Sequence, residues 1–326
     1  MKIVNSNILV TGGAGFIGSN LCEKLLSQNN VVTCFDNFST GKVENIDSFM
    51  HNSNFRLIKG DVRNIEDCQK AVDGADIVLH QAALGSVPRS VHDPITTNEV
   101  NVNGFLNMLW VSKEVGIKRF VFASSSSTYG DSDEKPSVED NIGHPLSPYA
   151  VSKLTNELYA NVFSTLYGLE TIGLRYFNVF GPRQDPKGNY AAAIPKFAAS
   201  LSEGKSPLIY GDGKQTRDFT YVDNVIQANQ LAALTDNPKA VNQVYNIAFG
   251  KCIDINAVLV QMKRVISVYK QDCADVEPIY TKERSGEVKH SYASIDKARH
   301  LLGYHPEFDF ARGLKSYIKW LFHKDF

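Results

Sequence analysis

Apolar and polar residues follow each other in regular blocks along the first half of the chain. Short apolar runs rich in β-branched and aromatic residues alternate with longer stretches in which apolar residues recur at helical spacing. We expect strands at 8–11, 31–35, 55–59, 76–80, 119–123 and 170–175, and helices that include 64–73, 94–115 and 148–167. Strands that alternate with helices in this way predict the α/β class, with a doubly wound parallel sheet.

The alternation ends near Pro182, and a different organisation follows. Shorter helical patterns and the turn at 210–213 indicate a smaller α/β unit that resembles a lid. We therefore divide the chain into a first domain, 1–180, and a second domain, 181–326. A helix at 222–234 and a strand at 244–247 lead us to expect that 217–250 returns to the first domain.

Length and composition are those of an ordinary globular protein. The chain has 326 residues, of which 43% are hydrophobic and 21% are charged, and its formal net charge is −1. This balance gives no electrostatic reason to expect nucleic acid or an anionic membrane as a partner. No apolar run approaches the ~18 residues of a membrane span. Since residues 1–5 lead directly into the first strand, we expect no signal peptide.

The five cysteines lie far apart in the sequence and are odd in number. Cysteines that bind a metal ion usually come in close pairs, so we expect no metal site. Reduced, mostly buried thiols are typical of cytosolic proteins, and we therefore expect a cytoplasmic location.

Three glycines, Gly12, Gly15 and Gly18, stand between the first strand and the first helix. The first allows a tight turn, the second lets the backbone approach a phosphate, and the third lets the helix pack against the strand. The amides at the helix N-terminus would then hold a pyrophosphate, although a glycine-rich turn without a ligand can have the same spacing. Asp36 ends the next strand about twenty residues further on, where a carboxylate accepts both hydroxyls of an adenosine ribose and repels a 2′-phosphate. The sequence thus predicts a Rossmann-type domain that binds NAD in preference to NADP.

Candidate catalytic residues follow the fifth strand. Four serines, 124–127, stand at its end, and Ser147 and Pro148 then begin a helix on which Tyr149 and Lys153 are four residues apart. That spacing places the tyrosine and the lysine on one helix face. Beside a nicotinamide, a lysine ammonium can stabilise a tyrosinate that acts as a base, and a serine can hold the alcohol oxygen. The alternatives are a solvated serine loop and a surface pair of tyrosine and lysine.

The chain resembles the extended short-chain dehydrogenase/reductase superfamily in five segments, namely 11–18, 36–41, 125–130, 149–153 and 175–182. Within this superfamily it is similar to nucleotide-sugar 4-epimerases over essentially its whole length. Residues 80–90 and 289–291 are most similar to bacterial UDP-N-acetylglucosamine 4-epimerases, which make UDP-N-acetylgalactosamine for surface polysaccharides.

The resemblance implies an isomerase that interconverts UDP-N-acetylglucosamine and UDP-N-acetylgalactosamine at C4. Tyr149 would remove the C4 hydroxyl proton while the C4 hydride passes to a tightly bound NAD. The 4-keto sugar would then turn over and take the hydride back on its other face. UDP-glucose and UDP-galactose would be poorer substrates. The resemblance also implies a homodimer that pairs the helices at 94–115 and 148–167.

The same resemblance assigns the site residues. It implies catalytic roles for Ser125, Tyr149 and Lys153. The residues expected around NAD are Gly12, Gly15, Phe16, Ile17, Gly18, Asp36, Asn37, Ser39, Thr40, Gly41, Asp61, Val62, Gln81, Ala82, Ala83, Asn101, Tyr149, Lys153, Tyr176 and Val179. The residues expected around the UDP-sugar are Gly85, Ser86, Ser125, Ser126, Ser127, Tyr149, Asn178, Ala192, Arg217, Arg284, Glu287 and Ser291. Either Ser126 or Ser127 would contact the N-acetyl group.

Three positions depart from the patterns of related epimerases. Gly85 stands where the galactose enzymes have a lysine, and Ser291 stands where the bacterial galactose enzyme has a bulky tyrosine. Both changes remove volume beside the sugar and leave space for a C2 acetamido group. The alternative is neutral variation, with the space filled by water. Glu287 replaces a commoner aspartate at the ribose-binding position.

Other functions share parts of this pattern. A nucleotide-sugar 4,6-dehydratase has an Asp-Glu pair after a threonine at the end of the fifth strand, whereas this chain has serines there and Asp133 and Glu134 only further on. A UDP-uronic acid 4-epimerase or decarboxylase would need another cation near C6, which the sequence does not assign. A non-catalytic NAD-binding scaffold usually lacks the tyrosine or the lysine.

Overall fold

A computed structural model describes residues 1–187, 192–283 and 289–323. Its strands are β1 (Asn7–Thr11), β2 (Val31–Asp36), β3 (Phe55–Lys59), β4 (Ile77–His80), β5 (Arg119–Ser125), β6 (Thr171–Tyr176), β7 (Val179–Phe180), β8 (Leu208–Tyr210), β9 (Thr216–Arg217), β10 (Thr220–Tyr221), β11 (Gln243–Ile247), β12 (Ile253–Asp254), β13 (Ile279–Thr281) and β14 (His290–Ser291). Its helices are α1 (Phe16–Leu26), α2 (Ile65–Val72), α3 (Val87–His92), α4 (Pro94–Asn98), α5 (Gly104–Glu114), α6 (Pro148–Tyr167), α7 (Ala193–Ser202), α8 (Val222–Leu234), α9 (Ile255–Ile266), α10 (Asp296–Leu302) and α11 (Phe310–Phe322). Short 3-10 turns cover Val43–Asn45, Asp47–Phe49, Ser126–Tyr129 and Gln271–Asp275.

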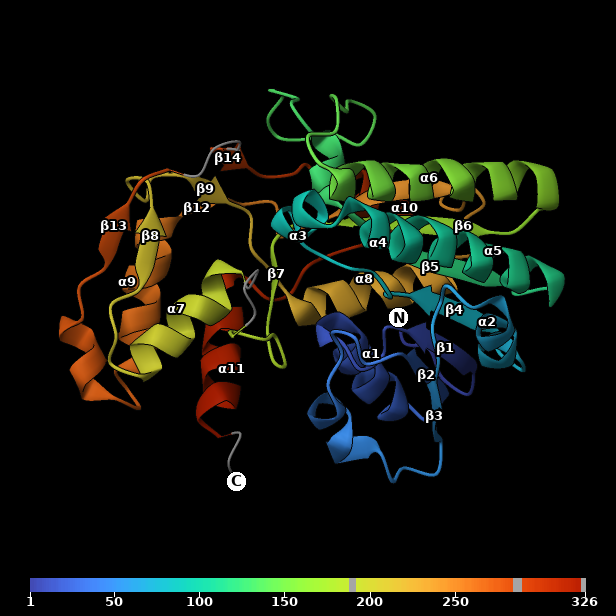
Figure 1. The fold of residues 1–326 in the computed structure, drawn as a ribbon, viewed down its shortest axis with the longest axis horizontal. Helices are drawn as coiled ribbons and strands as arrows, with labels where there is room; N and C mark the ends of the chain where they lie inside the picture. The colour runs from blue at the N-terminus through green and yellow to red at the C-terminus, as the bar shows by residue number, and fades with distance from the viewer. Residues whose placement is uncertain (188–191, 284–288, 324–326) are drawn as a thin grey trace.

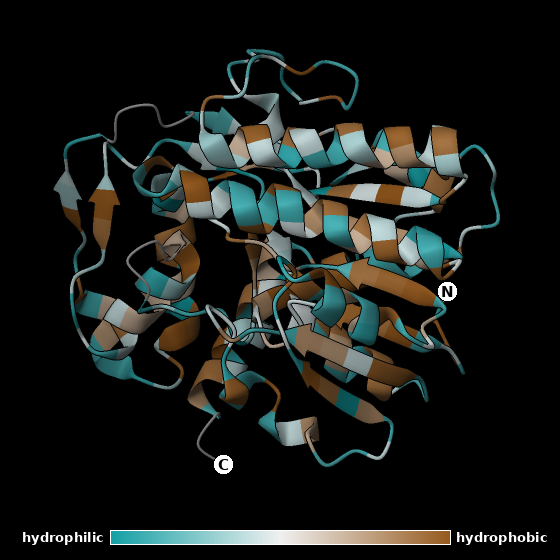
Figure 2. Ribbon diagram, turned by 45° about the vertical axis from the view of Figure 1, so that its right-hand side comes forward, coloured by the Kyte–Doolittle hydropathy of each residue, from teal (hydrophilic) through white to brown (hydrophobic). Residues whose placement is uncertain are grey.

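A sheet of seven parallel strands forms the centre of the molecule, in the order β11-β6-β5-β4-β1-β2-β3 (Figure 1). Helices α1 and α8 pack on one face of this sheet, and α2, α5 and α6 pack on the other. The strands are largely apolar and lie between these helix layers (Figure 2). The predicted α/β fold with a doubly wound parallel sheet is therefore confirmed.

The direction of the strand order changes at β1, because β2 follows β1 on one side and β4 lies on the other. The carboxyl ends of these strands leave a crevice at this point, where ligands of such sheets bind. β11 pairs with β6, and α8 packs on β5 and β6, so both elements lie with the large sheet although they follow residue 182. Helices α7, α9 and α11 surround a separate apolar core that includes Phe197, Leu259 and Leu314.

The helix that carries the candidate base begins as the sequence predicts. The Ser147 hydroxyl accepts a hydrogen bond from the Ala150 N–H at 3.1 Å, and Pro148 is the first helical residue of α6. The helix ends at Gly168, whose φ of +70° suits the left-handed end of a helix. Both end signals are therefore local, since they lie at the residues that flank α6.

The helical pattern expected over 94–115 is confirmed, but one turn within it departs from α-helical hydrogen bonding. A π-helical turn at Glu99–Asn103 separates α4 from α5. The Asn101 side chain in this turn is buried, accepts a hydrogen bond from the Leu84 N–H at 2.8 Å and donates to the Ser152 hydroxyl at 3.1 Å. A π turn accommodates an extra residue at the expense of regular hydrogen bonds, and these tertiary hydrogen bonds favour it here.

Candidate active site

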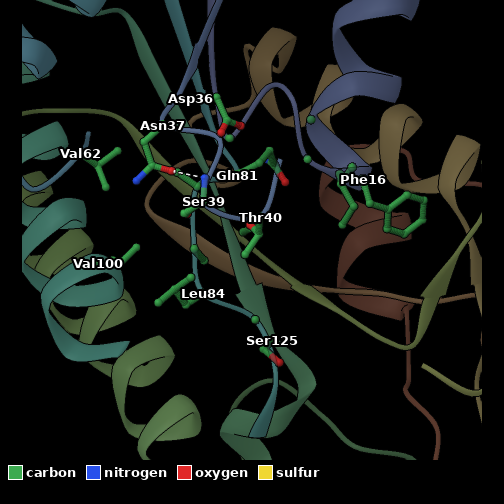
Figure 3. A pocket seen from close by; sticks show the side chains of 18 of the residues that line it. Phe16, Asp36, Asn37, Ser39, Thr40, Val62, Gln81, Leu84, Val100 and Ser125 are labelled. Atoms are coloured by element: carbon green, nitrogen blue, oxygen red, sulfur yellow. Dashed lines mark hydrogen bonds between the residues drawn. The ribbon is translucent and has the colours of Figure 1, made fainter. Parts of the chain in front are cut away.

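A cavity of about 360 Å³ opens at the carboxyl ends of β1, β2, β4 and β5 (Figure 3). Its wall includes these predicted cofactor residues: Gly12, Gly15, Phe16, Ile17, Gly18, Asp36, Asn37, Ser39, Thr40, Val62, Gln81, Ala82, Ala83, Tyr149, Lys153, Tyr176 and Val179. It also includes Phe35, Gly60, Leu84, Val100, Ala123 and Ser124, which sequence reasoning missed. Most of these missed residues are direct sequence neighbours of predicted ones. This adjacency was the signal that could have identified them as cavity residues.

The glycine turn brings the backbone close to the cavity. Gly12 has a φ of +66°, and a Cβ at this position would lie 2.8 Å from the backbone nitrogen of Ala82. A Cβ on Gly18 would collide with the carbonyl oxygen of Gly12, so α1 packs directly on the turn. Helix α1 follows Gly15, and no side chain in the described ranges caps it. Its N-terminal N–H groups and the positive end of the helix dipole therefore fit a pyrophosphate.

Asp36 lies at the edge of the same cavity and is only 8% exposed. Its carboxylate accepts hydrogen bonds from the backbone N–H groups of Ala14 at 2.9 Å and Phe38 at 2.8 Å. Burial raises the pKa of Asp36, and these two hydrogen bonds lower it. Each oxygen keeps a further acceptor position, which fits the two hydroxyls of an adenosine ribose. Asn37 and Ser39 lie beside it and are joined by a 2.9 Å hydrogen bond (Figure 3).

Three residues that we expected around the cofactor are not among the residues that line the cavity. A Cβ on Gly41 would lie 2.8 Å from the Asp36 carboxylate, so this glycine packs against the aspartate. Asp61 accepts a hydrogen bond from Asn37 Nδ2 at 2.8 Å, and Asn101 holds the backbone that follows β4. Each of them therefore supports a lining residue.

A closed set of hydrogen bonds forms another part of the wall. The Tyr176 hydroxyl donates to Gln81 Oε1 at 3.1 Å and accepts from Asn229 Nδ2 at 2.9 Å, while Gln81 Nε2 donates to Asn229 Oδ1 at 3.2 Å. Asn229 lies on α8 and is fully buried. Sequence reasoning missed Asn229, because no local pattern links this asparagine to Gln81, which follows β4, or to Tyr176 on β6.

Tyr149, Lys153 and Ser125 meet on one side of the cavity. Lys153 is 2% exposed, and its Nζ donates to the Ala123 carbonyl at 2.8 Å and lies 6.0 Å from the centre of the Tyr149 ring. Burial lowers the pKa of Lys153 to about 8, and the negative charge of Glu157 acts in the opposite direction. Burial raises the pKa of Tyr149, and a hydrogen bond with Ser125 lowers it. A tyrosine so placed can exchange a proton with an alcohol held by the serine.

The serines after Ser125 differ in their contacts. Ser125 Oγ accepts hydrogen bonds from the backbone N–H of Ser127 at 3.2 Å and from its hydroxyl at 2.9 Å. Ser126 begins the 3-10 turn, and both Ser126 and Ser127 are half-buried. The Ser127 hydroxyl thus supports Ser125.

A second cavity, of about 810 Å³, adjoins the first. Val179 lines both cavities, and they meet where Gly85 lines the first and Ser86 the second. The predicted substrate residues on its wall are Ser86, Asn178, Ala192 and Arg217. Lys187, Lys196 and Glu203 also line it, so the charged side chains of the wall are mainly basic and suit a diphosphate.

Arg217 and Ser291 lie side by side. β14 pairs in parallel with β9, and Ser291 stands opposite Arg217 in the register. Arg217 Nη1 donates to the carbonyl oxygens of Thr216 at 2.9 Å and Lys289 at 3.1 Å, which fixes the guanidinium beside this strand pair. Asn178 Nδ2 donates to the Asp218 carbonyl at 3.0 Å.

Two of the predicted substrate residues, Arg284 and Glu287, lie outside the described residues. Gly85 borders open space, since a Cβ placed there would have no described atom within 4 Å.

None of the described helices is long and apolar enough to cross a membrane. Residues 1–187, 192–283 and 289–323 contain no group of three or more His, Cys, Asp or Glu side chains that could hold a metal ion.

Three comparisons with known proteins bear on this geometry. The model of the NAD dependent epimerase/dehydratase family matches residues 8–248. A UDP-N-acetylglucosamine 4-epimerase from Methanobrevibacter ruminantium M1, solved in complex with UDP-N-acetylmuramic acid, is 40% identical, with a TM-score of 0.91 over 99% of this chain and 100% of that chain. A UDP-glucose 4-epimerase from Thermotoga maritima, solved with UDP-glucose, is 36% identical, with a TM-score of 0.89 over 98% of this chain and 99% of that chain. A UDP-glucuronate 4-epimerase from Thermodesulfobacterium geofontis is 33% identical over 96% of this chain and 95% of its own length.

Proposed function

We propose a substrate for this chain, which belongs to the NAD dependent epimerase/dehydratase family of the short-chain dehydrogenase/reductase superfamily. It is an NAD-dependent nucleotide-sugar 4-epimerase. We assign to it the reversible interconversion of UDP-N-acetylglucosamine and UDP-N-acetylgalactosamine, with UDP-glucose and UDP-galactose as weaker substrates.

The open space at Gly85 is the observation that carries this choice of substrate. A Cβ there would have no described atom within 4 Å, and Gly85 lines the same cavity as Tyr149. Ser291, beside Arg217, is likewise a small side chain. The N-acetylated sugars need this volume for their C2 acetamido group, and the Methanobrevibacter ruminantium neighbour is named for such a substrate.

The reaction follows from three residues that line the first cavity, Ser125, Tyr149 and Lys153. NAD, when bound, supplies a reversible hydride acceptor for C4 of the sugar. Tyr149 takes the C4 hydroxyl proton, and Ser125 holds the same oxygen through its hydroxyl. Lys153 supplies the positive charge that stabilises the tyrosinate. After the 4-keto sugar has turned over, Tyr149 returns the proton to the C4 oxygen.

Separate parts of the chain hold the two ligands in this proposal. Residues 1–180, to which 217–250 returns, form the NAD-binding domain, and residues 181–326 form the UDP-sugar-binding domain, whose ligand also reaches Ser125 and Tyr149 of the first domain. Support for the second assignment comes from Arg217 and Lys196 on the cavity wall, and from α7, whose N-terminus at Ala192 has no side-chain cap within the described ranges. Cations and an uncapped helix N-terminus are suited to a diphosphate.

We also propose that two copies of the chain form a dimer through α4, α5 and α6. These helices lie side by side, and their outer surface exposes apolar side chains: Ile95, Trp110, Val151, Leu158, Val162 and Leu166. Such a surface is typical of a subunit interface. Light scattering should give twice the chain mass for the wild type, and Leu158→Glu should reduce it to one chain.

The test of the reaction uses the purified protein with UDP-N-acetylglucosamine and no added cofactor. We expect the purified protein to contain bound NAD and to form UDP-N-acetylgalactosamine. Chromatography of the reaction products measures this conversion. Tyr149→Phe should retain NAD and lose activity by at least about 100-fold, because the proton acceptor is removed. Faster turnover of UDP-glucuronate would favour a uronic acid epimerase, and a 4-keto-6-deoxy product would favour a dehydratase. Unchanged turnover by Tyr149→Phe would contradict the proposed role of this residue.

A further inference from the structure

One buried carboxylate connects the two elements that carry the catalytic groups. Ser125 belongs to β5, whereas Tyr149 and Lys153 belong to α6. Glu157 lies one helical turn after Lys153 and is 8% exposed. It accepts a hydrogen bond from the hydroxyl of Ser124, the residue directly before Ser125. A shift of β5 relative to α6 would break this hydrogen bond.

Arg175 on β6 holds the Glu157 carboxylate in one orientation. Its Nε donates to Oε1 at 2.9 Å and its Nη2 donates to Oε2 at 2.7 Å, which makes a bidentate pair. Arg175 is 4% exposed, donates from Nη1 to the Glu139 carbonyl at 2.9 Å and lies 4.9 Å from the centre of the Tyr129 ring. Because Ser124 and Arg175 are opposite each other in the β5–β6 register, both reach the same carboxylate.

The charge of Glu157 also acts on Lys153. The charged and titratable groups around this lysine are Tyr149 and Glu157 on α6, His80 on β4 and Arg175 on β6 behind Glu157. Burial, helped by the charge of Lys153, lowers the pKa of His80 to about 3, so this histidine is neutral. Among the described residues, Glu157 is therefore the side chain whose negative charge favours the ammonium form of Lys153.

We propose that Glu157 is a positioning residue for the epimerase reaction, which ties the β5 serines to α6 and places a negative charge one helical turn from Lys153. This inference rests on the proposed roles of Ser125, Tyr149 and Lys153. Glu157 lines neither of the two cavities, so it acts through Ser124 and Lys153 and does not touch the substrate.

The first test is Glu157→Gln, which removes the charge and keeps an oxygen that can accept from Ser124. The kcat of the NAD-loaded enzyme for UDP-N-acetylglucosamine is measured from about pH 6 to about pH 10. A unit charge ~6 Å away shifts a pKa by about two units at an effective dielectric constant of ~20. We expect the alkaline limb of kcat to move down by about one to two pH units, because Lys153 loses its proton earlier.

Two more variants separate the charge from the hydrogen bond. Ser124→Ala should lower kcat by about tenfold and leave the alkaline limb in place, since the charge is retained. In Glu157→Asp the alkaline limb of kcat should lie close to its wild-type position, because the negative charge is kept. Its kcat should stay reduced, because the shorter side chain does not reach Ser124. The matched control is Glu170→Gln, which breaks an ion pair of the half-exposed Glu170 with Arg119 and should leave the pH profile unchanged.

An alkaline limb that stays in place in Glu157→Gln overturns the proposed effect on Lys153. Wild-type kcat in both Ser124→Ala and Glu157→Asp overturns the proposed tether, and these two variants decide that point if Glu157→Gln does not fold. Failure of the proposed function is a different result, in which the NAD-loaded wild type converts neither UDP-N-acetylglucosamine nor UDP-glucose. In that case the phenolate of Tyr149 is titrated by ultraviolet difference absorbance against Tyr149→Phe. Its midpoint should be higher in Glu157→Gln, because Lys153 loses the ammonium that stabilises the phenolate at a lower pH. An unchanged midpoint refutes the inference.

Discussion

Replacing Lys153 with methionine should make the protein more stable at neutral pH and inactive. The methionine side chain is similar in length to that of lysine and carries no charge. Burial lowers the pKa of Lys153 from 10.5 to about 8, so below pH 8 the buried ammonium costs about 3 kcal/mol of folding free energy. The variant also loses the 2.8 Å hydrogen bond from Nζ to the Ala123 carbonyl, which costs about 1–2 kcal/mol. We therefore expect a net gain of about 1–2 kcal/mol near pH 7.

The sign of the pH dependence follows from the same pKa. Between about pH 8 and about pH 10.5 the unfolded wild type binds more protons at Lys153 than the folded wild type, so wild-type stability rises with pH. This rise is absent in Lys153→Met, and the advantage of the variant should disappear towards the upper end of that range. Turnover should fall by at least about 100-fold, because the tyrosinate loses the neighbouring ammonium.

The assay is urea unfolding of both proteins near pH 7 and near pH 10, with the NAD content of each sample measured first, because bound NAD also stabilises the fold. Lys239→Met is a suitable control, since Lys239 is exposed and the substitution removes an equal charge. Two results would refute the conclusion that burial of the Lys153 ammonium destabilises the fold. One is a Lys153→Met variant that is less stable than the wild type near pH 7. The other is a difference in unfolding free energy between the two proteins that does not change with pH.

Three further predictions concern residues in and around the two cavities. Gly18→Ala should abolish NAD retention, because its Cβ collides with the Gly12 carbonyl; a full NAD content after purification would contradict this. Ser291→Tyr should lose UDP-N-acetylglucosamine turnover before UDP-galactose turnover, and equal loss on both would argue against a size gate. Asn229→Ala should weaken NAD retention by about tenfold, because it removes a hydrogen-bond partner of Gln81. Dialysis followed by NAD quantification tests the last prediction, and wild-type retention would disprove it.

The sequence by itself determined the elements that carry the cofactor turn and the catalytic pair. The apolar run of β1, the spacing of Gly12 and Gly18, and the start of α6 at Ser147 are signals that lie within one element or between adjacent ones. Local propensity and side-chain spacing are sufficient to interpret such signals. The π-helical turn within 94–115 is the exception, because Asn101 forms its hydrogen bonds with Leu84 and Ser152 outside the helix.

Only the tertiary structure decided which distant residues support the site. Asn229 meets Gln81, which precedes it by 148 residues, and Arg217 meets Ser291 through the pairing of β9 with β14. Glu157 likewise receives both of its partners, Ser124 and Arg175, from strands. A single asparagine or glutamate on a helix has no local pattern that marks it, since its partner comes from another element. Packing of α6 and α8 on the sheet therefore decides these contacts.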